Sequence, residues 1–224
     1  MRPRIALISA TPAAIGPAMA GLAEAFPEAE VWNLLDDKLL DDADAAGGLT
    51  ERLCERMRGL IHHAVSGGAD GILLTCSMYG AVTGTVETGI PVLAPDEAAF
   101  SAVAGGGYGH VLVVASLETA LADSVSRLRR AAGPAVAVDG VVCPGAFEAA
   151  KRADRPALLD ALLTTVRDSS SEAFLLAQYS LAPVADELAQ ALDRPVVSGP
   201  QAAAARLRTA IAGPALDVRD GRAR

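Results

Sequence analysis

The sequence is poor in cysteine, histidine and aromatic residues, and each shortage argues against a class of protein. Of its 224 residues, 4% are aromatic, three are histidines and three are cysteines. The cysteines (Cys54, Cys76 and Cys143) are few and widely spaced, which argues against a disulfide framework. No cluster of histidine and cysteine has the spacing of a metal site, so we expect no metal. No glycine-rich turn follows an expected strand, so we also expect no nucleotide cofactor.

Basic residues and long apolar runs are also scarce. The net charge is −8, and lysine occurs only at Lys38 and Lys151. This balance gives no support for binding nucleic acid or an anionic membrane surface. No apolar run approaches the roughly 18 residues that span a bilayer. The first run, residues 4–9, meets Thr11 and Pro12 at once, so we interpret it as a strand rather than a signal peptide. These features predict a cytoplasmic protein.

What the sequence does contain is a regular alternation of short apolar runs with longer, alanine-rich amphipathic stretches. This alternation is typical of parallel sheets covered by helices on both faces. The expected strands are residues 4–9, 29–34, 70–75, 91–94, 110–115, 135–142, 173–177 and 195–197, and the expected helices are 13–25, 49–66, 78–88, 96–104, 118–131, 145–152, 156–168, 182–192 and 200–212.

The two halves of the chain resemble each other. GILLTCSMYGAV at 71–82 is similar to AFLLAQYSLAPVA at 173–185, and GIPVLAPDEAA at 89–99 is similar to DRPVVSGPQAA at 193–203. We predict two similar α/β domains related by pseudo-two-fold symmetry, each with a roughly four-stranded parallel sheet. The first domain comprises residues 1–98 plus 200–224, and the second comprises 99–199.

Polar side chains stand where the expected strands end. Open parallel sheets bind ligands beyond the carboxyl ends of their strands, and two facing domains would bring these ends to one cleft. The side chains at these ends include Ser9, Thr11, Thr75, Cys76, Ser77, Ser116, Cys143, Gln178, Tyr179 and Ser180.

Cys76 is the main candidate for chemistry because it stands between an expected strand and an expected helix. At a helix N-terminus, the helix dipole and free backbone N–H groups favour the thiolate. The same N–H groups, with the hydroxyls of Thr75 and Ser77, would hold a carboxylate or an oxyanion. The alternative is a small, buried apolar side chain. Packing is the better interpretation of Cys143, and Cys54 has core spacing on its helix.

Two further patterns near the expected cleft have simple interpretations. A cysteine hydrolase needs a histidine beside its thiol. His62 and His63 come late in their helix and His110 begins a strand, so all three are expected on the side away from the cleft. The acidic run 36–42 is interpreted as a solvated loop, with a lid over the cleft as the alternative.

The chain resembles the aspartate, glutamate and hydantoin racemase superfamily, which includes maleate isomerase and arylmalonate decarboxylase. The resemblance implies two facing α/β domains with the active site between them, no cofactor, and a homodimer or higher homo-oligomer. The segments that carry it are SATP at 9–12, GADGILLTCSMYG at 68–80, PVLAPDEAA at 91–99, VLVVAS at 111–116, FLLAQYSLAPVADEL at 174–188 and PVVSGPQAA at 195–203.

The resemblance matches Cys76 to the first of the two cysteines that these racemases use. The second falls at residues 177–179, where this chain has Gln178, a residue without a titratable proton. Tyr179 and Cys143 are the candidates for a substitute, although a phenol has an ordinary pKa of about 10. One thiol alone would serve decarboxylation of a malonate-type substrate, which needs one acid, or cis–trans isomerisation, which needs one nucleophile.

The leading hypothesis is a cofactor-independent racemase, isomerase or decarboxylase that acts next to a carboxylate or carbonyl of a small molecule. In it, Cys76 is the acid, base or nucleophile. The alternative is a catalytically silent protein of the same fold that binds small carboxylates or has a regulatory role. Lys38 is the nearest expected cation to the cleft. The expected substrate-binding residues are Ser9, Thr11, Thr75, Ser77, Ser116, Gln178 and Ser180.

Overall fold

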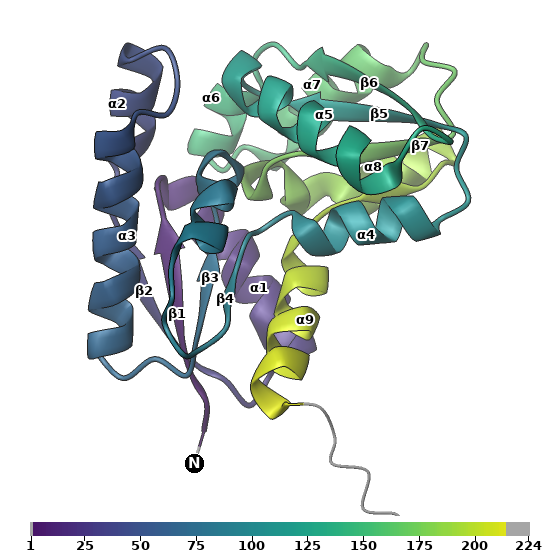
Figure 1. The fold of residues 1–224 in the computed structure, drawn as a ribbon. Coiled ribbons are helices and arrows are strands. Elements are labelled where there is room, and N and C mark those ends of the chain that lie inside the picture. The colour runs from purple at the N-terminus through teal and green to yellow at the C-terminus, as the bar shows by residue number, and fades with distance from the viewer. Residues whose placement is uncertain (1, 214–224) are drawn as a thin grey trace, which may run out of the picture.

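A computed structural model describes residues 2–213 as two α/β halves, each built on a four-stranded parallel sheet (Figure 1). The strand order is β2-β1-β3-β4 in the first sheet and β6-β5-β7-β8 in the second, so the two halves have the same topology. The strands are β1 (Arg4–Ser9), β2 (Glu30–Leu35), β3 (Gly71–Leu74), β4 (Val92–Leu93), β5 (His110–Ala115), β6 (Ala137–Val142), β7 (Ala173–Leu176) and β8 (Val196–Val197). The predicted fold class is confirmed.

Helices cover both faces of each sheet. They are η1 (Pro12–Ala14), α1 (Ile15–Ala25), α2 (Leu39–Ala45), α3 (Glu51–Ser66), η2 (Ser77–Thr85), α4 (Glu97–Gly105), α5 (Glu118–Ala132), α6 (Ala146–Lys151), α7 (Arg155–Val166), η3 (Tyr179–Val184), α8 (Ala185–Leu192) and α9 (Pro200–Ala212), where η marks a 3-10 helix. Within residues 2–213, no helix has the length and apolar character needed to cross a membrane.

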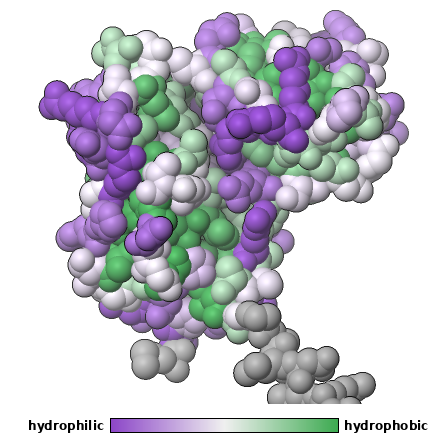
Figure 2. All heavy atoms as spheres, in the orientation of Figure 1, coloured by the Kyte–Doolittle hydropathy of each residue, from purple (hydrophilic) through white to green (hydrophobic). Residues whose placement is uncertain are grey.

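The central strands β1 and β5 are buried because apolar side chains leave both of their faces. Successive residues of a strand point to opposite faces. Ile5 and Leu7 pack in one core with residues of α1 and α9, whereas Ala6 and Ile8 pack in another with residues of α3. Hydrophilic residues line the outer side of α3, while apolar residues gather over the first sheet between α3 and α9 (Figure 2). Burial on two faces therefore explains why these strands are nearly continuous apolar runs.

The chain crosses between the halves twice, and the two crossings touch. After β4, the chain enters α4, whose Phe100 packs in a core with β5. After β8, it enters α9, whose Leu207 packs in a core with β1. A Cβ atom added to Gly199 would lie 2.6 Å from the carbonyl oxygen of Pro95. The domain boundaries at 98/99 and 199/200 stay a prediction, and Met1 and residues 214–224 lie outside the described residues.

Two expected elements differ from the structure. The expected α-helix at 78–88 is the 3-10 helix η2, in which the hydroxyls of Thr83 and Thr85 donate to the carbonyls of Gly80 and Val82. Two glycines and these local bonds disfavour a regular α-helix there. Similarly, the expected helix at 182–192 begins as η3, with Pro183 inside it, and continues as α8.

The acidic run 36–42 is only partly the expected loop. It leads into α2, a short helix that sequence reasoning missed. Arg56 of α3 pairs with Asp36 and, through a contact of 2.8 Å, with Asp42. These ion pairs hold the acidic run against α3, so part of its charge is balanced rather than solvated.

Candidate active site

A cavity of about 30 Å³ lies beside Cys76 and is lined by residues of both halves. The strands β1, β3 and β7 all end at it, as expected for parallel sheets. The expected site residues that line it are Thr11, Thr75, Cys76, Ser77, Gln178, Tyr179 and Ser180. Ser9, Ser116 and Cys143 are not among its lining residues.

The thiol of Cys76 stands at the start of η2, in extended backbone conformation. Burial raises its pKa to about 11. The backbone N–H groups of Met78 and Tyr79 act in the opposite direction, and the charges of Asp96 and Asp123 raise the pKa further. This pKa favours the protonated thiol at neutral pH, whereas a helix N-terminus alone would favour the thiolate. The reason is that burial outweighs the N–H groups of a short 3-10 helix.

The hydroxyls next to Cys76 are engaged with protein groups. Thr75 donates its hydroxyl hydrogen to the hydroxyl oxygen of Ser9, at 2.9 Å. Ser77 donates to the backbone carbonyl of Ala177, at 2.7 Å, and this bond joins the end of β3 to the end of β7. Ser9 thus holds the Thr75 hydroxyl in place by accepting its hydrogen bond. Ser77 connects the two halves next to Cys76.

Gln178 stands at the same point of the second half as Cys76 does of the first. Its side-chain oxygen accepts hydrogen bonds from the backbone N–H of Ser116, at 2.6 Å, and from the Ser116 hydroxyl, at 3.0 Å. A backbone N–H only donates, so the amide oxygen must face Ser116. Gln178 and Cys76 both line the cavity, and the amide NH₂ group of Gln178 is the part that remains able to donate a hydrogen bond to a ligand.

Tyr179 and Cys143, the two candidates for a substitute base, form hydrogen bonds with other protein groups. The Tyr179 hydroxyl donates to the Pro95 carbonyl at 3.1 Å, and burial raises the pKa of Tyr179 well above its ordinary value. Cys143 lies in the core of the second half, where the Thr165 hydroxyl donates to its sulfur at 3.2 Å. Neither geometry favours proton abstraction from a substrate at Cys76.

Lys151 is a lining residue that sequence reasoning missed. Its ammonium group lies 5.2 Å from the centre of the Phe147 ring, which also lines the cavity. Lys38, the expected cation, instead pairs with Asp41 at 3.3 Å and is not a lining residue. A signal was present in the repeat, because each lysine comes soon after the second strand of its half: Lys38 immediately precedes α2, and Lys151 is the last residue of α6.

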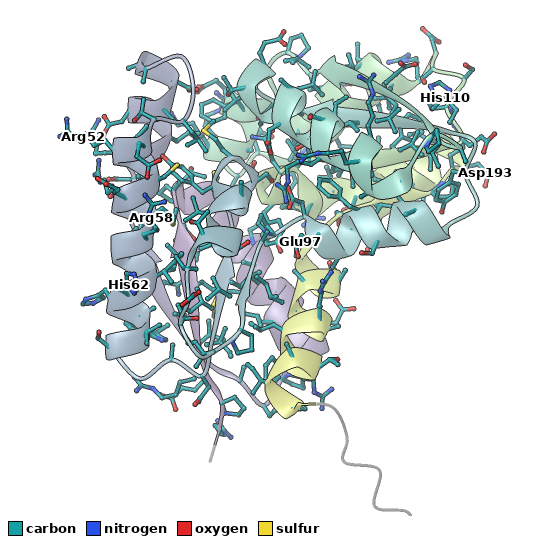
Figure 3. The ribbon with its side chains drawn as sticks, viewed as in Figure 1. Arg52, Arg58, His62, Glu97, His110 and Asp193 are labelled. Carbon is teal, nitrogen blue, oxygen red and sulfur yellow. The ribbon has the colours of Figure 1, made fainter. Side chains whose placement is uncertain are left out.

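Histidine and metal chemistry have no support in the described part of the chain. None of the three histidines lines the cavity. His62 lies on α3, and His110 begins β5 in the second half, where its Nε2 is 3.0 Å from an Asp139 oxygen (Figure 3). Residues 2–213 contain no group of three or more histidine, cysteine, aspartate and glutamate side chains arranged to hold a metal.

A wider groove of about 780 Å³ adjoins the cavity. The two share Ala13, Ala150, Lys151 and Ser180 as lining residues. Further along, the groove is lined by residues of α1 and α7, such as Pro17 and Leu158. Its volume is in the range of small-molecule sites, about 300–1,000 Å³.

Solved structures that align with nearly the whole chain include racemases and a decarboxylase. Aspartate racemase from Picrophilus torridus aligns with a TM-score of 0.74 at 16% identity, over 94% of each chain. Allantoin racemase from Klebsiella pneumoniae aligns with a TM-score of 0.68 at 20% identity, over 94% of this chain and 88% of that one. The fold is that of the racemases.

A decarboxylase has this racemase fold as well. A liganded variant of arylmalonate decarboxylase, with one glycine changed to cysteine and one cysteine to serine, aligns with a TM-score of 0.62 at 20% identity. It covers 95% of this chain and 94% of that one. No family model and no curated protein sequence matches the chain. At these identities the likeness confirms the expected fold.

Proposed function

We propose that this protein is a cofactor-independent lyase that removes CO₂ from a small malonate-type carboxylate, with Cys76 as the proton donor. The observation that carries this proposal is that Cys76 and Gln178, from the ends of β3 and β7, line one cavity, with the amide oxygen of Gln178 held by Ser116. The racemase fold, which a decarboxylase shares, supports it. Two-cysteine racemisation finds no support here, because Gln178 has no titratable proton.

The proposed reaction needs one acid and one place to hold negative charge. The bond between the α-carbon and one carboxylate breaks, CO₂ leaves, and the electron pair remains as an enediolate. The thiol of Cys76 gives its proton to the α-carbon, and water later returns a proton to the sulfur. The N–H groups of Met78 and Tyr79 stabilise the transient thiolate, and the amide NH₂ of Gln178 donates to the enediolate oxygen.

Lys151 supplies the positive charge for substrate binding. Its ammonium group is at the rim that the cavity shares with the groove, where it would attract a carboxylate. A cavity of about 30 Å³ holds about one water molecule. The reacting carbon therefore sits at Cys76, and the larger substituent of the substrate extends into the groove.

The test is a panel of substituted malonates incubated in D₂O with wild-type protein, Cys76→Ala and Cys54→Ala. We expect CO₂ release with one deuterium incorporated at the α-carbon for wild type and Cys54→Ala, and strongly slowed release for Cys76→Ala. Loss of proton transfer from a positioned acid costs about 10²–10⁴-fold in rate. Full turnover by Cys76→Ala would show that the thiol is not the acid.

Two alternatives give different results in the same experiment. An isomerase would exchange an α-proton or change double-bond geometry without releasing CO₂, and the racemase neighbours favour this second candidate. A catalytically silent protein would bind small carboxylates in calorimetry without any isotope exchange. The homodimer or higher homo-oligomer and the cytoplasmic location also stay predictions, and sedimentation measures the first.

A further inference from the structure

Arg127 of α5 is a largely buried arginine that reaches from the second half toward the turn that carries Cys76. Its guanidinium forms two parallel hydrogen bonds of 2.7 Å each with the carboxylate of Asp96, the residue that precedes α4. The side chains of Arg127 and Asp96 are only 13% and 7% exposed. Two-pronged pairs of this kind fix geometry as well as charge.

The same guanidinium contacts the turn that carries Cys76. Its Nη1 atom donates to the backbone carbonyl of Ser77 at 3.3 Å. It also fills the space next to Gly80, where an added Cβ would lie 2.6 Å from Nη1. On its other side, the guanidinium lies 5.2 Å from the centre of the Phe100 ring. Arg127 thus contacts η2 at Ser77 and at Gly80, and its own position is fixed by Asp96 and Phe100.

The contact with the Ser77 carbonyl has a consequence for the neighbouring amide. The carbonyl of Ser77 and the N–H of Met78 belong to one planar trans peptide, so they point in opposite directions. The Met78 N–H is one of the two backbone groups that lower the pKa of the Cys76 thiol. A group that fixes the Ser77 carbonyl therefore also fixes the direction of the Met78 N–H.

We propose that Arg127, oriented by Asp96, is a positioning residue that holds the Ser77–Met78 peptide so that the Met78 N–H faces the Cys76 sulfur. A buried ion pair adds little net stability, because the cost of desolvating both charges opposes their attraction. Holding the Ser77–Met78 peptide is a role for the Asp96–Arg127 pair that does not depend on net stability. The importance of Arg127 for turnover rests on the proposed role of Cys76, but its effect on the thiol does not.

The readout is alkylation of Cys76 as a function of pH, in a background with Cys54→Ala and Cys143→Ala. The titratable and charged groups that surround Cys76 are Tyr79, Asp96, Asp123, Arg127, Lys151 and Tyr179. Arg127→Met should slow alkylation roughly tenfold at pH 9, because one N–H bond to the thiolate is lost. The unpaired Asp96 acts in the same direction, since its charge raises the Cys76 pKa.

The matched control is Arg129→Met on the same helix. Arg129 donates to the Val138 carbonyl of the second half, through bonds of 2.6 and 3.1 Å. Its removal should leave alkylation unchanged. Arg127→Lys should not restore the wild-type rate, because an ammonium lacks the two-pronged fork. Recovery with lysine would mean that charge alone matters, and would overturn the positioning role.

Gly80→Ala tests the proposal without removing any charge and serves if Arg127→Met does not fold. The added methyl displaces the guanidinium, and we expect alkylation several-fold slower. A wild-type or faster rate in either folded variant, verified by circular dichroism, would overturn the proposal. Failure of the proposed function is separate: turnover by Cys76→Ala would refute that function and leave the alkylation result intact.

Discussion

The ends of β3 and β7 are equivalent in the fold and opposite in chemistry. Cys76 and Gln178 each follow the third strand of their half and each begin a 3-10 helix, with φ/ψ of −113°/116° and −136°/140°. One presents a protonated thiol to the cavity, and the other presents an amide that Ser116 orients. The repeated backbone thus provides two facing positions, while the side chains restrict proton transfer to one of them.

The strongest test of this asymmetry exchanges the two ends. In Gln178→Cys combined with Cys76→Ser, the proton would reach the planar enediolate from the opposite face. We expect the major product enantiomer to invert, which chiral chromatography measures on a prochiral malonate. Gln178→Cys alone serves as the control and should give both enantiomers. Retention of the wild-type enantiomer by the double variant would show that the second position does not face the substrate.

The pH dependence of Cys76 sharpens the comparison. Its pKa is raised from 9.0 to about 11, so the thiolate forms only as pH rises toward 11. In a variant that carries only Cys76, alkylation at pH 8 should be about a hundredfold slower than that of a thiol with pKa 9.0, and should rise about tenfold per pH unit. Half-maximal alkylation below pH 9 would contradict a buried, protonated acid.

A smaller effect, on substrate binding, is expected from Lys151 at the rim of the cavity. Lys38, the other lysine of the chain, serves as its control. Lys151→Met removes a cation that lines the cavity, whereas Lys38→Met removes one that pairs with Asp41. We expect Lys151→Met to raise KM for a dicarboxylate about tenfold with a smaller change in kcat, and Lys38→Met to change neither. Equal effects of the two substitutions would remove Lys151 from the site.

The smallest expected effect is on stability, and it concerns the hydrogen bond between the ends of β3 and β7. Ser77→Ala removes the hydrogen bond to the Ala177 carbonyl and leaves that buried acceptor without a partner. The free energy of unfolding, measured in urea, should fall by about 1 kcal/mol. Ser101→Ala is the control, because its hydroxyl donates within α4 at an exposed position. An equal loss of unfolding free energy in both variants would mean that the bond between Ser77 and Ala177 contributes no more to stability than a bond within an exposed helix.

Local pattern was sufficient to predict the strands, but contacts between residues that are distant in the sequence were not readable from it. The apolar runs gave the bounds of β1 and β5, since burial on both faces requires them. They gave no sign that the acidic run would fold into α2 beside Arg56. The Asp96–Arg127 pair and the protonated state of Cys76 also depend on burial, which the order of residues along one segment does not reveal.

Pro95 and Gly199 approach each other closely where the chain crosses between the two halves. Both chain crossings pass through this point, and a Cβ at Gly199 would lie 2.6 Å from the Pro95 carbonyl oxygen. The Tyr179 hydroxyl donates to the same oxygen. A side chain at position 199 would therefore collide both with this oxygen and with the Tyr179 ring, 2.8 Å from the added Cβ. The absence of a side chain at Gly199 is thus what lets the two crossings and Tyr179, a residue that lines the cavity, come together at one place.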